Sequence, residues 1–216
     1  MLTRKGAKLV GDTATAERMN KRADEVKAAF AREFISSTGR IGYDDQTSYA
    51  LAIVYDLIPP DLLPAARDYF KATIARADGR IGTGFIGTPA LLPALLKIGE
   101  PSLAAAVFLQ EEVPGWLYQV KNGATTIWER WDAIQADGTI FAPAMNSYNH
   151  YAYGAVCQWL FEAVAGFRPD EDAPGFAHIV YEPLIIPQLS PVKAHHDSRA
   201  GRIEAAWSLD GDDVTY

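Results

Sequence analysis

The sequence predicts a mainly α-helical chain that ends in a short β segment. Apolar residues recur at helical spacing in several stretches between residues 13 and 165. The string Gly-Arg-Ile-Gly occurs at Gly39–Gly42 and again at Gly79–Gly82, and this spacing of 40 residues is the length of a two-helix hairpin with its loops. After Phe167 the helical period disappears, and proline becomes frequent.

Six helices are expected in chain order. Val26, Phe30 and Phe34 recur at four-residue spacing and mark the first helix. Gly166 is the expected glycine at the end of the sixth and most apolar helix. The six cover about residues 13–35, 46–57, 61–77, 88–98, 102–110 and 147–165. Helix pairs of this kind form either an open superhelix or a closed toroid of inner and outer helices.

The C-terminal stretch predicts a β-hairpin. Arg202–Leu209 alternates polar and apolar residues, and Asp210-Gly211-Asp212 supplies a turn. Because two strands alone do not form a stable sheet, we expect either a truncated β domain or strands that pack against the helices. The expected division is a helical domain over 1–166 and the beginning of a β domain over 167–216.

Composition and charge narrow the classes of partner. Of the 216 residues, 49% are hydrophobic and 22% are charged, a balance typical of globular proteins. The net charge of −7 argues against nucleic acid, and the absence of a long apolar run or an apolar leader argues against a membrane.

The single cysteine, Cys157, lies in a helical context and is expected to be a small buried hydrophobe. Cytoplasmic location is expected, with export left open.

The stretch Thr125–Asp132 is the strongest candidate for a site. It places Glu129 between Trp128 and Trp131, with Arg130 and Asp132 alongside. Flat apolar rings lie against the C–H faces of sugars, and a carboxylate can transfer a proton, so the composition favours a sugar site. The alternative is an ordinary loop whose tryptophans fill a core and whose Arg–Asp pair is solvated.

Other polar groups are weaker candidates. Asn149 and His150, at the head of the sixth expected helix, are well placed to hydrogen-bond sugar hydroxyls, although a lone histidine is more often structural. Phe85 lies in a Gly-rich turn without the lysine of a phosphate loop and is available to line a cleft. Asp44-Asp45 is an expected N-cap region, with contact to a ligand as the less favoured alternative.

No metal or cofactor site is expected. The position four residues after His150 is a glycine, which offers no second ligand on the same helix face. His195 and His196 are adjacent, so on a strand they face opposite sides.

Two blocks of sequence resemble a known family. Gly123–Asp132 and Asn146–Tyr151 are similar to the late catalytic-domain motifs of bacterial α-L-rhamnosidases, glycoside hydrolase family 78. Gln46–Leu51, Thr83–Pro89 and Ala173–Phe176 fit the same family in the same order.

The resemblance implies a fold and a reaction. The family has an (α/α)6 toroid followed by a C-terminal β-sandwich, so this chain would hold a partial toroid of about six helices and a truncated β-sandwich segment. The implied reaction is inverting hydrolysis of terminal α-L-rhamnosides. By position in the motifs, Glu129 matches the general base and His150 a histidine that contacts the bound rhamnose. Trp131 and Trp128 are the expected aromatic walls.

The sequence departs from the family at the general acid. The family's acid lies in a segment containing Asp, Arg and Trp, well upstream of these helices, and nothing between Met1 and Asn20 matches it. We therefore expect a base without its acid, inactivity of the chain alone, and the N-terminal half of the enzyme as a partner. The alternatives are a non-catalytic helical module that binds carbohydrate or protein, and a helical-toroid glycosidase for another sugar.

Overall fold

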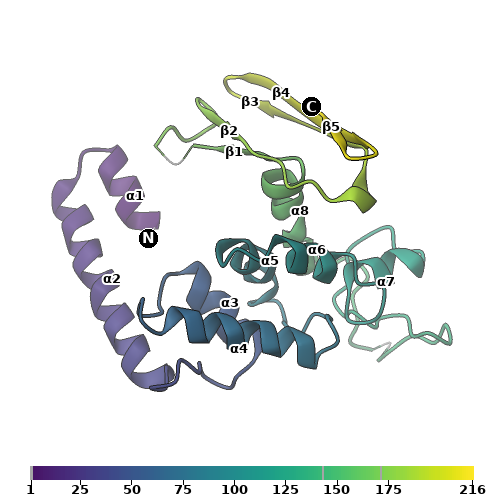
Figure 1. The fold of residues 1–216 in the computed structure, drawn as a ribbon, viewed down its shortest axis with the longest axis horizontal. Coiled ribbons are helices and arrows are strands. Elements are labelled where there is room, and N and C mark those ends of the chain that lie inside the picture. The colour runs from purple at the N-terminus through teal and green to yellow at the C-terminus, as the bar shows by residue number, and fades with distance from the viewer. Residues whose placement is uncertain (1, 143, 171) are drawn as a thin grey trace. The chain divides into compact units, whose positions relative to one another are not determined.

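The computed structural model describes residues 2–142, 144–170 and 172–216. The chain divides into two compact units, Met1–Gly99 and Glu100–Tyr216, here named the N-terminal unit and the C-terminal unit. In Figure 1 the N-terminal unit carries the purple and blue helices, and the described β-strands follow at the green and yellow end.

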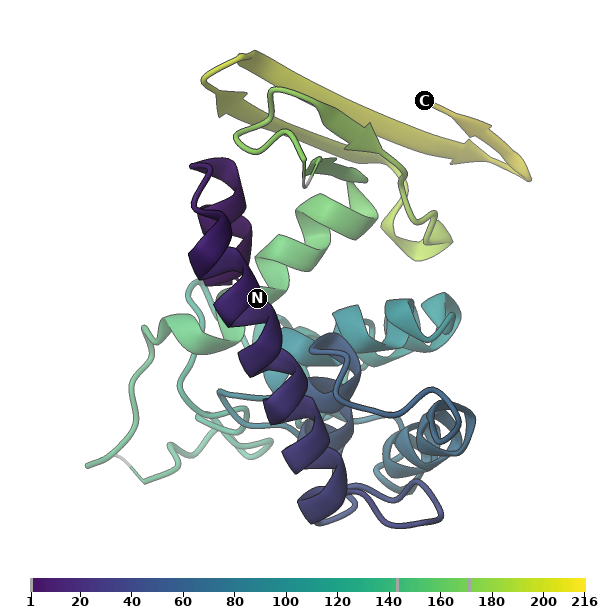
Figure 2. The same cartoon turned by 90° about the vertical axis from the view of Figure 1, so that its left-hand side faces the viewer.

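The N-terminal unit is helical. Its described helices are α1 (Leu2–Leu9), α2 (Thr13–Phe34), α3 (Gln46–Val54), α4 (Leu63–Arg76) and α5 (Thr88–Lys97). The last four confirm expected helices to within a few residues, whereas α1 was not expected. Figures 1 and 2 both show α2 as a long helix beside α1, and Ala16 is the buried residue of α2.

Capping carboxylates begin two of these helices. Oδ1 of Asp12 accepts a hydrogen bond from the Thr15 N–H at 2.9 Å, and Oδ1 of Asp45 accepts one from the Ser48 N–H at 2.8 Å. These bonds satisfy N–H groups that have no partner inside the helix. The expectation of an N-cap at Asp44-Asp45 is confirmed.

The core of the N-terminal unit lies where α3 packs against α4 and α5. Tyr49 and Phe70 are fully buried, with ring centroids 6.1 Å apart. The Tyr49 hydroxyl donates to Oδ1 of Asp44 at 2.7 Å and accepts from the Ile41 N–H at 3.3 Å. Burial, followed by the hydrogen bond to Asp44, raises the pKa of Tyr49.

The two Gly-Arg-Ile-Gly strings form related turns, one before α3 and one before α5. Each buries its isoleucine in the core, Ile41 at 1% exposure and Ile81 at 2%. Gln46 of α3, which is buried, donates from Nε2 to the Arg80 carbonyl at 2.9 Å, and its Oε1 accepts from the Gly82 N–H at 2.7 Å. This pair of bonds, here named the Gln46 bridge, fixes the backbone on both sides of Ile81.

The C-terminal unit begins with short helices. These are α6 (Pro101–Phe108) and α7 (Trp116–Lys121), and after a long loop η1 (Tyr151–Ala155), α8 (Val156–Trp159) and η2 (Leu160–Val164). The fifth expected helix is confirmed as α6, and α7 was not expected. The three last segments form one continuous helical stretch whose pitch changes from 3₁₀ through α to π.

The prediction of one helix over 147–165 was wrong at its beginning. The helical stretch starts at Tyr151, because residues 147–150 hydrogen-bond to another part of the loop instead. Its end follows the expectation. Gly166 has φ +83°, and a Cβ there would lie 2.3 Å from the Pro183 Cα, so only glycine fits this close approach.

The prediction that Cys157 is buried was also wrong, because its side chain is exposed. In α8 the neighbouring Val156 and Trp159 take the buried positions, at 8% and 4% exposure. The cysteine therefore occupies the solvent side of a four-residue helix whose buried face is already filled.

The β segment forms two small antiparallel sheets. β1 (Phe167–Pro169) pairs with β2 (Ile179–Tyr181), and after η3 (Pro187–Leu189) the order is β3 (Val192–Ser198), β4 (Gly201–Asp210), β5 (Asp213–Thr215). The expected strand over 202–209 and its hairpin turn are confirmed, and β1, β2 and β3 were not foreseen. Trp207 of β4 is buried and donates from Nε1 to the Val164 carbonyl at 2.7 Å.

Candidate functional site

The two sequence blocks that carry the candidate residues lie side by side in the loop between α7 and η1. The Glu129 N–H donates to the Ser147 carbonyl at 2.8 Å, and the His150 N–H donates to the Ile127 carbonyl at 2.8 Å. These bonds run in both directions between residues 127–129 and 147–150. The pairing brings the segment of Glu129 next to the segment of Asn149 and His150, as the sequence motifs predict for one site.

The carboxylate of Glu129 takes part in this pairing. Its Oε2 accepts a hydrogen bond from the Ser147 N–H at 2.9 Å, in the place where a β ladder would use a backbone carbonyl. Among the residues that the structure describes, no donor is bonded to Oε1. Glu129 is half-buried, so its carboxylate has one oxygen anchored to the backbone and one oxygen open for another donor.

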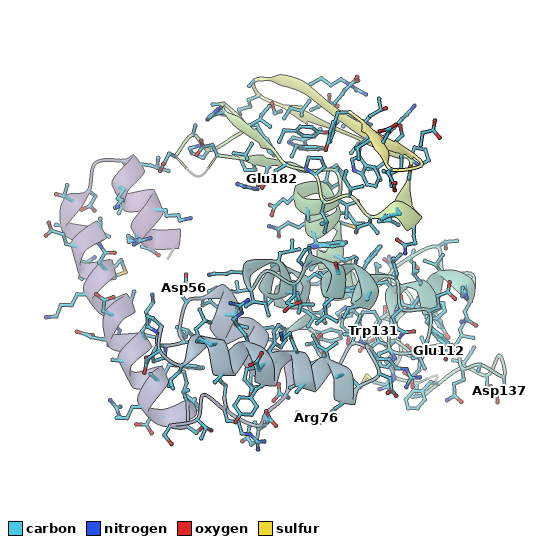
Figure 3. The ribbon with its side chains drawn as sticks, in the orientation of Figure 1. Asp56, Arg76, Glu112, Trp131, Asp137 and Glu182 are labelled. Atoms are coloured by element: carbon cyan, nitrogen blue, oxygen red, sulfur yellow. The ribbon has the colours of Figure 1, made fainter. Side chains whose placement is uncertain are left out.

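The two tryptophans beside Glu129 are buried by other aromatic rings. Trp128 is 3% exposed and meets Tyr148 edge to face at 5.8 Å, while Trp131 is 8% exposed and stacks on Tyr153 at 3.9 Å. A second ring, Trp116, meets Trp131 edge to face at 5.5 Å. Figure 3 labels Trp131 among the packed side chains, with Asp137 at the outer end of the loop.

These rings therefore behave as the core-filling alternative describes. Their burial holds the backbone on both sides of Glu129. The assignment of Trp128 and Trp131 to sugar contact stays a prediction.

Arg130 and Asp132 form a pair at the edge of this packing. The Arg130 Nε lies 3.1 Å from Oδ1 of Asp132, and its guanidinium carbon lies 3.8 Å from the Phe141 ring centroid. Both side chains are partly exposed, and ion pairs of this kind contribute little to stability. The pair matches the solvated Arg–Asp pair of the same alternative.

His150 precedes the first turn of η1. Its Nδ1 accepts from the Ala152 N–H at 3.4 Å, and its ring lies parallel to the Tyr151 ring at 5.6 Å. Tyr151 is 89% exposed, and Asn149 is exposed as well. His150 and Asn149 thus belong to the segment whose backbone binds that of Glu129, and their contact with a sugar stays a prediction.

Phe85 belongs to the N-terminal unit and is half-exposed. It lies in the turn that enters α5, where the Thr88 hydroxyl donates to the Gly84 carbonyl at 2.8 Å. This turn leads directly into α5, and the role of Phe85 in lining a cleft stays a prediction.

Three residues of the site had no strong signal in the sequence. Ser147 binds the carboxylate through its backbone, which any residue except proline could do. Gln119 of α7 is 2% exposed; its Oε1 accepts from the Trp128 N–H at 3.3 Å and its Nε2 donates to the Arg130 carbonyl at 3.4 Å. We name this pair of bonds the Gln119 bridge.

The third such residue, Tyr153, is 6% exposed and lies under Trp131. Burial is the main cause that raises its pKa; the Arg130 charge lowers this pKa and the Glu129 charge raises it. The phenol therefore lies within the electric field of Glu129 and Arg130. Its position three residues after His150 was the only sequence signal.

The described part of the chain holds no cluster of metal-binding side chains. There, no group of three or more His, Cys, Asp or Glu side chains could hold a metal ion. In β3, His195 pairs with Glu204 and His196 with Ile203, and alternating exposure places the two histidines on opposite faces as expected.

Among the described helices, none is long and apolar enough to cross a membrane.

Comparison with known proteins identifies similar sequences and structures. Residues 1–164 match the bacterial alpha-L-rhamnosidase 6 hairpin glycosidase domain, and residues 166–216 match the bacterial alpha-L-rhamnosidase C-terminal domain. An alpha-L-rhamnosidase of Streptomyces avermitilis is 37% identical over 182 residues, which cover 84% of this chain and 18% of that protein. An alpha-L-rhamnosidase of Alteromonas sp. (strain LOR) is 33% identical, covering 99% of this chain and 24% of that protein.

Solved structures agree with the sequence comparison. The Streptomyces avermitilis alpha-L-rhamnosidase complexed with L-rhamnose superimposes with a TM-score of 0.88 at 34% identity, over 96% of this chain and 20% of that chain. The chain thus spans about a fifth of the length of the relatives that it matches. The observed helical unit followed by small antiparallel sheets is the mainly α fold with a β segment that the sequence predicts, as part of a six-hairpin domain.

Proposed function

Because the chain belongs to the bacterial α-L-rhamnosidase family, we propose that it provides the general-base side of a site that hydrolyses terminal α-L-rhamnosides with inversion. Glu129 is the base in this proposal. The observation that carries it is the asymmetric binding of the carboxylate, with Oε2 held by the Ser147 N–H and Oε1 without a bonded donor in the described residues. An oxygen held open in this way is suited to accept a proton from water.

The chemistry of inversion requires two carboxyl groups. One carboxylate removes a proton from the water that attacks the anomeric carbon, and a carboxylic acid protonates the leaving oxygen from the other side. In inverting enzymes the two stand about 6.5–9.5 Å apart, which leaves room for the water. In this proposal Glu129 performs the first task, and the acid comes from a segment outside these 216 residues.

The residues around Glu129 divide between support and recognition. Trp128 and Trp131, buried on either side, hold the segment that carries the carboxylate. His150 and Asn149 contact the hydroxyls of the sugar. L-Rhamnose is the sugar bound in the Streptomyces avermitilis structure, which supports rhamnose as the sugar recognised here.

A substrate that needs no general acid gives the sharpest test. In α-L-rhamnosyl fluoride the C–F bond breaks to release fluoride without protonation, so a base alone suffices: water forms the new C–O bond and its proton passes to Glu129. We expect the purified chain to hydrolyse this fluoride slowly and to leave methyl α-L-rhamnoside intact. The first product is β-L-rhamnose, as observed by NMR. Glu129→Gln lowers the rate about 100-fold or more.

Glu112→Gln is the matched control, because Glu112 is an exposed glutamate of the same unit; it should retain the full rate. The proposal fails if the chain does not exceed the spontaneous rate, if the first product is α-L-rhamnose, or if Glu129→Gln is as active as the wild type.

A non-catalytic carbohydrate-binding module is the second candidate, favoured by the exposed Tyr151 ring parallel to His150. All five tryptophans lie in the C-terminal unit, so their fluorescence reports on the unit that carries the candidate site. Saturable change on adding L-rhamnose, without hydrolysis of the fluoride, would identify this function. A panel of other glycosyl fluorides separates it from a glycosidase for another sugar.

A further inference from the structure

We propose that Gln119 is a positioning residue that holds the backbone on both sides of Glu129, so that the carboxylate meets the Ser147 N–H. The meaning of this role for catalysis rests on the proposed function of Glu129 as base. The Gln119 bridge joins α7 to the Trp128 N–H and to the Arg130 carbonyl, the polar backbone groups that flank Glu129.

The segment around Glu129 has no regular structure to hold it. Residues 122–133 form neither a helix nor a strand, so their backbone groups must find partners outside a ladder. The Gln119 bridge supplies a donor and an acceptor from one side, and the Ser147 carbonyl accepts the Glu129 N–H from the other. Together these three bonds hold the peptide units 127–128, 128–129 and 130–131, on either side of Glu129, and so restrict the direction of its Cα–Cβ bond.

The side chain of glutamine is suited to this task. Its amide has one oxygen that accepts and one nitrogen that donates, which matches one N–H and one carbonyl. Gln119 is 2% exposed, so solvent cannot replace it as a partner for these backbone groups without opening the packing. A side chain of the same length without the amide would fill the space and lose both bonds.

The helix that carries Gln119 is itself held firmly against the loop. Trp116 donates from Nε1 to the Tyr153 carbonyl at 3.0 Å, and the Tyr118 hydroxyl donates to the Ile134 carbonyl at 2.9 Å. Both side chains are buried. Three residues of one short helix therefore bind three separate parts of the site, and Gln119 is the one whose bonds flank the carboxylate.

The test measures the contact between Glu129 and Ser147 without any turnover. In ¹⁵N–¹H spectra of the full 216-residue chain, Glu129→Gln replaces a charge-assisted hydrogen bond to the Ser147 N–H by a weaker one and so shifts that amide proton. The same comparison is then made in the Gln119→Met background. We expect the Ser147 shift caused by Glu129→Gln to fall to roughly half or less, because the loosened backbone no longer presents the carboxylate to the amide.

Gln46→Met is the matched control, because it removes an equivalent buried bridge from the N-terminal unit. It should leave the Ser147 response unchanged. If Gln119→Met does not fold, Gln119→Glu replaces it: this side chain keeps the length and the acceptor for the Trp128 N–H but, when ionised, has no donor for the Arg130 carbonyl. Its Ser147 response should lie below that of the wild type.

An unchanged Ser147 response in a folded Gln119 variant overturns the proposal. This outcome is independent of the role of Glu129 in catalysis, which the fluoride assay tests separately. Where that assay detects hydrolysis, Gln119→Met should lower kcat about tenfold and leave KM unchanged, because the substrate-contacting groups stay in place. A change in KM alone would also count against positioning.

Discussion

The Gln46 bridge and the Gln119 bridge use one device for two different purposes. In each unit a buried glutamine of a helix binds the backbone on both sides of a single residue. Gln46 binds the two peptide groups that adjoin Ile81, whereas the groups that Gln119 binds lie one peptide further out and enclose Trp128–Arg130, with Glu129 at the centre. Ile81 is 2% exposed and part of the core, whereas Glu129 is a half-buried charge.

The two bridges also differ in length. The bonds of Gln46 measure 2.9 and 2.7 Å, and those of Gln119 measure 3.3 and 3.4 Å. Hydrogen bonds weaken as they lengthen beyond about 3.2 Å. In the N-terminal unit, the short bonds of Gln46 and the burial of Ile81 both stabilise the fold. At Glu129 the bonds are weaker, and partial burial of the charge opposes folding.

This difference explains the density of aromatic rings in the candidate site. Rings that pack on either side of Glu129 supply the apolar burial that a central isoleucine supplies elsewhere. The tryptophans of the motif therefore stabilise the position of a carboxylate that contributes little stability itself.

The largest effect should come from Trp131→Ala, which removes the ring between Tyr153 and Trp116. Truncation of a buried tryptophan costs about 3–5 kcal/mol, so the free energy of unfolding of the C-terminal unit should fall by about that amount. Urea denaturation followed by the fluorescence of the remaining tryptophans measures it, since all of them lie in this unit.

Phe161→Ala is the control for Trp131→Ala, because Phe161 is 43% exposed in the same unit; its effect should be smaller. A loss for Trp131→Ala below about 1 kcal/mol would mean that ring packing does not support the segment around Glu129.

The sequence predicted most of the helices, and the reason is their apolar period. The beginning of the sixth helix could not be predicted, because residues 147–150 bind residues 127–129 across the loop and no local pattern encodes that pairing. The six-residue helix α7 is too short to show a period. Cys157 was misjudged because the buried face of α8 depends on which neighbours fill it.

For the site, the sequence predicted the adjacency of the Glu129 and His150 segments, through two motifs in the order typical of a family. It did not predict Gln119 or Gln46, because a single glutamine has no characteristic spacing and its bridge forms only in the folded chain. The sequence left the burial of Trp128 and Trp131 open as one of two alternatives. Charged neighbours suggested exposure, yet an irregular loop can turn successive side chains in different directions.

Removal of each bridge should destabilise its own unit by a different amount. Gln46→Met leaves the Arg80 carbonyl and the Gly82 N–H without their short bonds and should destabilise the N-terminal unit by about 2 kcal/mol. Gln119→Met removes longer bonds and should destabilise the C-terminal unit by about 1 kcal/mol. Native-state hydrogen exchange read by mass spectrometry resolves the two units.

Gln158→Met serves as the reference for both variants, because Gln158 is exposed and binds Glu162 on the surface. Equal effects of Gln46→Met and Gln119→Met, or a larger effect for Gln119→Met, would contradict the inference that the site has the weaker bridge.

The smallest expected change in stability concerns Asp44, a carboxylate of the N-terminal unit that a tyrosine side chain holds. The hydrogen bond from the buried Tyr49 hydroxyl, helped by the Arg40 and Arg76 charges, lowers the pKa of Asp44 from its ordinary value. A pKa lowered by folding contributes stability that is present above the unfolded value, about 4, and is lost as the pH falls through the folded value. The N-terminal unit should therefore lose stability as the pH falls below about 4.

Asp44→Asn keeps a hydrogen-bond acceptor for Tyr49 but removes the titration. The difference in stability of the N-terminal unit between the wild type and this variant, measured by native-state hydrogen exchange, should be largest near neutral pH and should shrink on acidification. A difference that is constant with pH would show that Asp44 acts only as a neutral acceptor.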